Sequence, residues 1–127
     1  MLRRFLYVQV HRGHFAVRVV NGTAALTRQC AALNHPRSIF GEFEPIRAAF
    51  AEAFKAIGGF RLGLFGPSGL IHLIPHLEGG YTHAELRAFR QAAQAAGMYL
   101  PYMLDDKHDP PTDKQIMQVV SELRIVG

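Results

Sequence analysis

Three histidines in the second half of the sequence have a spacing that zinc ligands can have. His72 and His76 lie four residues apart, on one side of an extended strand if Pro75 permits it, and His83 follows a few residues later. Three imidazole nitrogens can bind Zn²⁺ and leave a fourth position for water. A catalytic site also needs partners that orient each ligand, and the sequence shows none for these histidines.

A short acidic cluster, Asp105–Asp109, offers a second kind of chemistry. Asp105, Asp106 and Asp109, together with His108, could hold a hard cation through oxygen ligands. Two prolines follow at once, which is typical of a solvated loop. A small metal-dependent hydrolase that uses the three histidines or this cluster is therefore one alternative. The prediction we prefer contains no catalytic, cofactor-binding or metal-binding residue and no cofactor.

Other reactive motifs are incomplete. The glycine-rich segment Gly63–Gly69 has neither the spacing nor the Lys-Ser/Thr pair of a phosphate-binding loop. Leu70 stands where a nucleophile elbow around Ser68 needs a glycine. We predict a plain turn at Gly66–Gly69. Cys30 is the only cysteine, so we expect a packed small residue and no intrachain disulfide.

The composition predicts one domain, residues 1–127. The chain is 49% hydrophobic and 19% charged, and a chain of this size buries about two-thirds of its surface on folding. No apolar stretch approaches the roughly 20 residues of a membrane-spanning helix, and no run of residues resembles a signal peptide. We therefore expect a cytoplasmic protein with no transmembrane segment.

The net charge of +4 raises the question of an acidic partner. The basic residues are scattered singly between Arg3 and Arg124 and form no run. A sheet face carrying Phe5, Tyr7 and Phe15 among arginines could stack on bases. A nucleic-acid-binding domain is thus a second alternative, although the sequence contains no RNA-recognition signature.

Hydrophobic periodicity and turn residues predict an α/β domain. The hairpin connection His11-Arg12-Gly13-His14 contains a glycine that can adopt a positive φ. Thr82 and Glu85 form a capping box at the start of a helix that Gly97 ends. The expected elements are strands at Phe5–Val10, Phe15–Val20 and Ala24–Leu33, a helix through Ile46–Ile57, strands at Phe60–Phe65 and Leu70–Leu77, the helix from Thr82, a strand at Met98–Leu104 and a helix capped by Thr112.

One stretch of about a third of the chain, Leu70 to Asp106, resembles a known family. It contains Leu73-Ile74-Pro75-His76, then Glu85-Leu86-Arg87-Ala88-Phe89-Arg90-Gln91-Ala92-Ala93-Gln94-Ala95-Ala96-Gly97, then Leu104-Asp105-Asp106. These residues are similar to a segment of the bacterial actin-like, rod shape-determining (MreB-like) ATPases. The resemblance implies a single ribonuclease-H-like fold, the actin-like ATPase subdomain, in which a three-stranded meander joins parallel strands in a mixed sheet flanked by helices.

The same comparison implies that ATP is not bound. ATP-binding members of the family carry an Asp and a glycine-rich turn in the first hairpin, whereas here that stretch is Tyr7–His14 and no acid precedes Glu42. Those members also enclose ATP between two such halves, and this length suits one. We therefore expect a non-catalytic protein-binding module, with an actin-like filament or envelope-assembly protein as partner or with self-association into a homo-oligomer. The expected docking residues are His11, Arg12, Gly13, His14 and the strand Ala24–Leu33.

Overall fold

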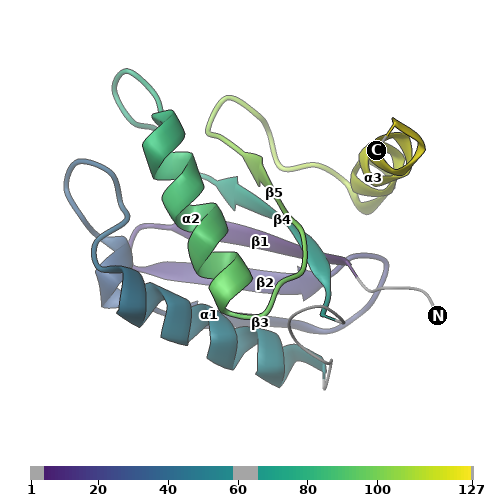
Figure 1. The fold of residues 1–127 in the computed structure, drawn as a ribbon, viewed down its shortest axis with the longest axis horizontal. Coiled ribbons are helices and arrows are strands. Elements are labelled where there is room, and N and C mark those ends of the chain that lie inside the picture. Colours follow the sequence, from purple (N-terminus) through teal and green to yellow (C-terminus); the bar gives the residue numbers. More distant parts are fainter. Residues whose placement is uncertain (1–4, 59–65, 127) are drawn as a thin grey trace.

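The computed structural model describes residues 5–58 and 66–126, the side chains only as far as residue 119 at the carboxyl end, and it contains an α/β domain built on one five-stranded mixed sheet (Figure 1). The strand order is β3-β2-β1-β4-β5. β1, β4 and β5 run parallel, and β2 is antiparallel to both of its neighbours. The strands are β1 Phe5–His11, β2 His14–Val19, β3 Ala25–Gln29, β4 Ser68–Leu73 and β5 Pro101–Leu104. The predicted mixed sheet, a meander beside parallel strands, is confirmed.

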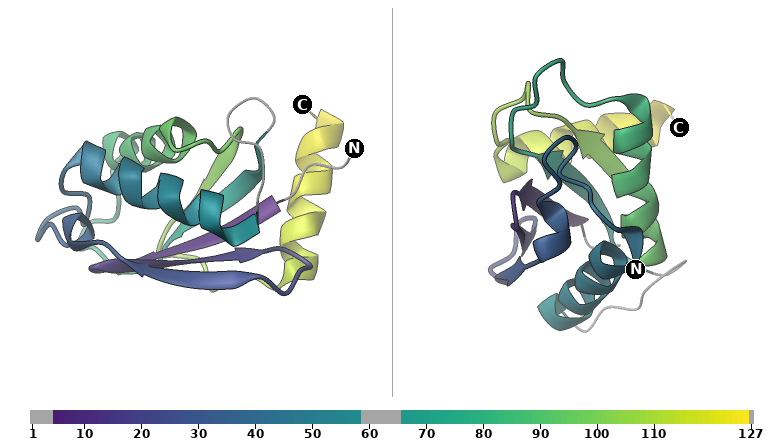
Figure 2. Two further views of the ribbon diagram at one scale, coloured as in Figure 1. Left: turned by 90° about the horizontal axis from the view of Figure 1, so that it is seen from below. Right: turned by 90° about the vertical axis from the view of Figure 1, so that its left-hand side faces the viewer.

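Three α-helices flank the sheet. They are α1 Phe43–Gly58, α2 His83–Ala95 and α3 Asp113–Val126, and a short 3₁₀ helix, η1, spans Ala31–Leu33. Figure 2 shows α1 and α2 together on one side of the sheet, with α3 apart from them at the end where β1 begins. The predicted capping box of α2 is present, because Thr82 Oγ1 accepts from the Glu85 N–H and Glu85 accepts from the Thr82 N–H.

Alternation along the strands divides the buried side chains into two clusters. The main core lies between the sheet and helices α1 and α2, and Cys30 packs at its margin as expected. A smaller cluster on the second face joins Phe5, Tyr7 and Val20 to Ile116 of α3. Phe15 lies in the main core, edge-on to Phe50. The predicted face shared by Phe5, Tyr7 and Phe15 is therefore wrong.

Several strand boundaries differ from the prediction. The third strand ends at Gln29, because the chain turns into η1 after Cys30 instead of extending to Leu33. Ser68 and Gly69 begin β4 rather than forming a turn, and β4 ends at Leu73, two residues before Pro75, which has no N–H for a strand ladder. β5 begins at Pro101, three residues later than expected. The predicted strand Phe60–Phe65 lies outside the described residues.

Gly69 suits β4 because a side chain there would force its neighbours to shift. A Cβ at this position would overlap the end of the Met98 side chain and would lie 3.0 Å from the Leu6 carbonyl oxygen. Gly13 has a different role, since its φ of 78° permits the two-residue turn of the first hairpin, as predicted.

Candidate binding edge at the carboxyl ends of the parallel strands

The carboxyl ends of β1, β4 and β5 bring most of the predicted site residues to one edge of the sheet. The register pairs Gln9 with His72 and His72 with Leu104, so His11 and Asp105 lie at the ends of the two flanking strands. In open α/β sheets this edge is where ligands bind. His83 is the first residue of α2 and lies beside Leu86 and Met103 at a separate surface hollow.

His72 is fully buried on the second face of the sheet. Its Nε2 lies 3.0 Å from the carbonyl oxygen of His108, and its Nδ1 lies 2.7 Å from the hydroxyl of Tyr7. A carbonyl only accepts, so Nε2 carries the proton and Nδ1 accepts from Tyr7. His72 is therefore neutral, in agreement with its burial, which lowers the pKa of the imidazole more than the hydrogen bond to His108 raises it.

From Tyr7 the series of side-chain hydrogen bonds continues along β1. The Gln9 amide donates to the Tyr7 hydroxyl at 3.1 Å, and His11 Nε2 donates to Gln9 Oε1 at 3.2 Å. We call the series His11–Gln9–Tyr7–His72–His108 the sheet-face chain. Burial raises the pKa of Tyr7 and lowers that of His11, with further lowering from His14 and His72. With neutral side chains, each N–H or O–H that takes part in this series donates to one acceptor.

His76 and Asp106 form a pair at the end of β4. His76 Nδ1 donates to Asp106 Oδ2 at 2.7 Å; the imidazole is 84% exposed and the carboxylate side chain only 3% exposed. The other oxygen, Oδ1, is buried and has no hydrogen-bond partner among the described residues. Tyr81 donates to the Pro75 carbonyl at 2.6 Å, and its pKa is raised, first by burial and then by the charge of Asp106.

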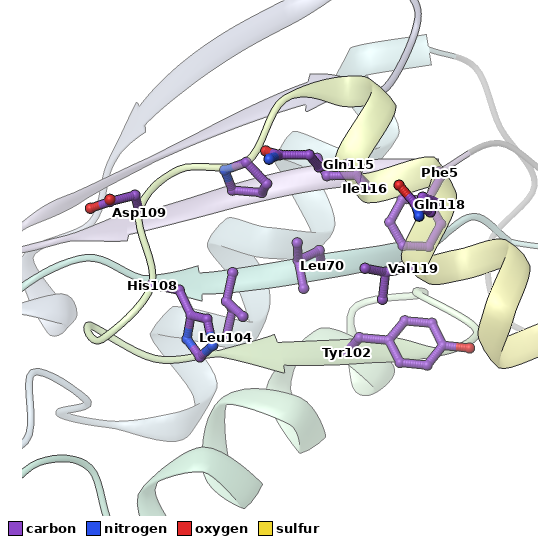
Figure 3. A pocket seen from close by; sticks show the side chains of 11 residues that line it. Phe5, Leu70, Tyr102, Leu104, His108, Asp109, Gln115, Ile116, Gln118 and Val119 are labelled. Atoms are coloured by element: carbon purple, nitrogen blue, oxygen red, sulfur yellow. The ribbon is translucent and has the colours of Figure 1, made fainter.

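The carboxylate of Asp105 accepts hydrogen bonds from residues of its own loop. Its Oδ1 accepts from the Lys107 N–H at 3.0 Å and from His108 Nδ1 at 3.2 Å. Burial alone would raise the pKa of Asp105, but these hydrogen bonds and the nearby positive charges outweigh it and hold the pKa below its usual value. Asp109 is exposed, and in Figure 3 its side chain points away from the other labelled residues.

The predicted ligand sets do not assemble in the structure. Within residues 5–58 and 66–126, no group of three or more His, Cys, Asp or Glu side chains is placed to hold a metal ion. His72 turns to Tyr7, His76 turns to Asp106, and His83 begins a helix. The structure therefore does not bring these three histidines together around one point, and it does not place three side chains of Asp105–Asp109 to share one cation.

The hairpin connection at His11–His14 is docked against the segment that follows β3. The Gly13 N–H donates to the Leu33 carbonyl at 2.9 Å, and the Gly13 carbonyl accepts from Cys30 at 2.8 Å. The rings of His11 and His14 stack at 4.7 Å with an interplanar angle of 1°. The connection thus has a defined shape and leaves Arg12 exposed at its tip.

The two edges of the sheet differ in what they offer a binding partner. Val19 donates to Ala24 and Cys30 donates to Gly13, so alternation directs the main-chain groups of Leu26 and Arg28 toward β2. The N–H groups of Ala25, Thr27 and Gln29 consequently point outward. We call this row the free β3 edge. No other strand pairs with it in the described part of the chain.

The opposite edge, β5, is shorter and poorer in donors. Gly69 donates to Leu100, and in a parallel ladder this directs the N–H groups of Tyr102 and Leu104 toward β4. Pro101 has no N–H, which leaves Met103 as the outward donor of this four-residue strand. A proline on an edge strand discourages pairing with another chain.

Sequence reasoning missed Tyr7 and Gln9 as members of the site. Period-2 alternation places both on the same face as His11, and this signal was available. The hydrogen bond between Tyr7 and His72 could not be predicted in this way, because it depends on the parallel pairing of β1 with β4, and the two residues are 65 positions apart in the sequence.

Comparison with known proteins adds no assignment. No protein-family model matches this chain, and no curated protein matches it in sequence. Among the described residues, no helix is both long enough and apolar enough to cross a membrane.

Proposed function

We propose that this chain is a non-catalytic protein-binding module that receives an extended segment of a partner protein at the free β3 edge. The observation that carries the proposal is the row of outward N–H groups at Ala25, Thr27 and Gln29. An exposed edge of this kind gains a strand through main-chain hydrogen bonds, and the side chains on either face supply specificity.

The β3 edge is held in place for such a role. Arg28 donates to Glu52 of α1 from both Nε, at 2.8 Å, and Nη2, at 3.2 Å. This bidentate pair anchors the strand to the helix behind it, which lowers the conformational entropy that a partner strand would otherwise have to overcome on pairing. The pair is exposed, so its own contribution to folding is small.

We propose further that the fold is a ribonuclease-H-like, actin-like subdomain acting in the cytoplasm. The meander β1–β3 beside the parallel strands β4 and β5 is the arrangement that the resemblance to MreB-like proteins implies. The same resemblance suggests an actin-like filament or envelope-assembly protein as the partner. A second copy of this chain, pairing edge to edge, is the other partner that this geometry supports.

Binding without ATP is part of the proposal. The first hairpin of ATP-binding relatives carries an Asp, whereas here His11 and Arg12 stand at the end of β1. The polar side chains of this edge also bond to one another, as His76 does to Asp106 and His72 does to the His108 carbonyl. Millimolar Mg-ATP should therefore leave the melting temperature unchanged, since a ligand that binds only the folded state raises it.

A matched pair of variants tests the docking edge. Thr27→Pro removes one outward N–H and leaves the ladder to β2 intact, while Thr27→Val keeps both the N–H and the branched side chain. Wild type and both variants would be used as baits in quantitative affinity purification. We expect a partner that wild type and Thr27→Val retain and that Thr27→Pro loses by about tenfold or more, a difference of roughly 1.4 kcal/mol in binding.

Each outcome of this experiment has a meaning. An actin-like filament protein among the lost partners supports the finer proposal. A wild-type dimer that Thr27→Pro converts to monomer, by analytical ultracentrifugation, identifies the occupant as a second copy. Retention of every partner by Thr27→Pro, with an unchanged melting temperature, contradicts docking at this edge.

One pair of side chains favours an enzyme as the second candidate. Asp106 orients His76 through Nδ1 and leaves Nε2 on the exposed side of the imidazole, as in carboxylate–histidine pairs that hold a metal or act as a general base. A metal-dependent hydrolase built on His76 would need further ligands, since no group of three His, Cys, Asp or Glu side chains among the described residues is placed to hold a metal ion. Such an enzyme would retain stoichiometric zinc or manganese through purification without chelators. Metal analysis of the purified protein distinguishes this candidate from a pure binding module.

A further inference from the structure

A mostly apolar cavity lies between α3 and the second face of the sheet. Its volume is about 400 Å³, within the range of sites that bind small molecules. In Figure 3, Leu70, Leu104 and Tyr102 extend from β4 and β5, and Gln115, Gln118 and Val119 come from α3. The cavity is on the β4–β5 side of the sheet, away from the free β3 edge.

The described contacts between α3 and the rest of the domain come from its first turns. Asp113 accepts from the Arg18 guanidinium and from the Asn21 N–H, and Ile116 is buried against Phe5. One turn further on, Val119 is 54% exposed although it lines the cavity. The first turns of the helix are therefore fixed on the sheet, and at Val119 the apolar lining of the cavity is open to solvent.

The side chains around the cavity determine which class of small molecule it can bind. Phe5 and Tyr102 form an aromatic wall, with ring centroids 6.2 Å apart and an interplanar angle of 24°. The described lining contains one carboxylate, that of Asp109, and no lysine or arginine, so an anionic group would find no counter-ion among the described residues. The imidazole of His108 is engaged with Asp105, and the uncharged amides of Gln115 and Gln118 are on α3.

We propose that this cavity is a binding site for a small, neutral aromatic molecule with one hydrogen-bonding group. The ring would lie against the aromatic wall and the leucines, where displacing water from apolar surface stabilises binding. The polar group would bond to a glutamine amide of α3. A carboxylate in the same place would be desolvated without a cationic partner among the described lining residues, which disfavours it.

Two probes with the same aromatic ring system and different charge test the proposal. 1-Naphthol is neutral and 1-naphthoate is anionic, and each would be titrated into the ¹⁵N-labelled full chain. We expect saturable shifts at the amides of Leu70, Tyr102 and Val119 with 1-naphthol, at a Kd of about 0.1–1 mM. We expect at least tenfold weaker binding of 1-naphthoate.

Two variants and a matched control locate the site. Leu70→Trp fills the cavity and should weaken 1-naphthol binding about tenfold or more, whereas Leu100→Trp adds the same ring at an exposed position outside it and should have no effect. Val119→Arg, at a largely exposed helix position that tolerates a long side chain, should shift the preference toward 1-naphthoate.

The proposal is overturned by any of three results. These are the absence of saturable shifts with 1-naphthol, equal affinity for the two probes in wild type, or undiminished 1-naphthol binding in a folded Leu70→Trp protein. If Leu70→Trp does not fold, the probe preference of Val119→Arg decides, and an unchanged preference counts against the site. None of these results bears on docking at the β3 edge.

Discussion

His72 makes the stability of this domain depend on pH in a direction that can be tested. The imidazole is fully buried and neutral, and its pKa is lowered below that of the unfolded chain, chiefly by burial. Between the folded and the unfolded pKa values, the unfolded state binds one more proton than the folded state. Stability from this group is therefore complete above the unfolded pKa of about 6.5 and is lost as the pH falls below it.

The largest possible pH dependence of stability from His72 follows from the single proton that it binds. One proton gives a slope of at most about 1.4 kcal/mol per pH unit in the free energy of unfolding. The hydrogen bonds of His72 explain why its protonation destabilises the folded state. A proton on Nδ1 would face the Tyr7 hydroxyl, which already accepts from Gln9. Tyr7 would then have to turn its own proton away from its only described acceptor.

The assay is a series of urea unfolding curves between pH 5 and pH 7.5 on wild type and His72→Gln. The variant cannot titrate at this position, and it keeps an amide that can donate to the His108 carbonyl. It loses the acceptor for Tyr7, so we expect it to be less stable than wild type by about 1–3 kcal/mol at pH 7.5.

The difference between the two proteins should shrink as the pH falls. Groups that do not interact with His72 are common to both proteins and cancel in this difference. The part of the lowered His11 pKa that comes from His72 is lost in the variant, which changes the difference in the same direction. Asp105 and Asp113 have lowered pKa values, so their stabilisation is lost only in more acidic solution. A difference that stays constant from pH 7.5 to pH 5, or grows on acidification, would refute the neutral, hydrogen-bonded state of His72.

Three further predictions concern stability. Gly69→Ala should cost about 2–4 kcal/mol in urea unfolding because its Cβ would clash with Met98 and with backbone, and Met98→Ala should recover part of that loss. Gly13→Ala should cost only about 1 kcal/mol, since the added Cβ meets nothing within 4 Å and the cost is the positive φ alone; a loss as large as that of Gly69→Ala would contradict this. Asp113→Ala should cost about 0.5–1.5 kcal/mol and increase amide exchange throughout α3, because the ion pair with Arg18 is partly exposed; unchanged exchange in α3 would mean that other contacts hold the helix.

Local signals in the sequence predicted local structure well. The capping box at Thr82 and Glu85 specifies the start of α2 through two reciprocal hydrogen bonds, and both are present. Gly13 adopts the positive φ that its turn requires. In each case the residues that decide the conformation are within four positions of one another, so no knowledge of the rest of the chain is needed.

The failures came from interactions between distant segments. The sequence contains no local signal that ends the third strand before Leu33, whereas in the structure the chain turns into η1 and Gly41 donates to the carbonyl of Ala32. His72 was considered as a metal ligand because its neighbours in sequence are histidines. Its neighbours in space are Tyr7 and the His108 carbonyl, and the pairing of β1 with β4 that brings Tyr7 there is not encoded in any local pattern.

The candidate site residues predicted from the sequence mostly form hydrogen bonds with other groups of the protein. His72, Asp105 and His76 each have a protein partner, and the buried Asp106 Oδ1, which no solvent reaches, is the one unpartnered side-chain atom of this kind among the described residues. Groups that are already hydrogen-bonded gain little from a ligand that must break those bonds first. The N–H groups of Ala25, Thr27 and Gln29 along the free β3 edge have no hydrogen-bond partner among the described residues, so a partner strand would have to displace only solvent there. We therefore expect the binding free energy of this domain to come from its main chain at β3, and substitution of His76 or Asp105 by alanine to affect folding more than it affects partner binding.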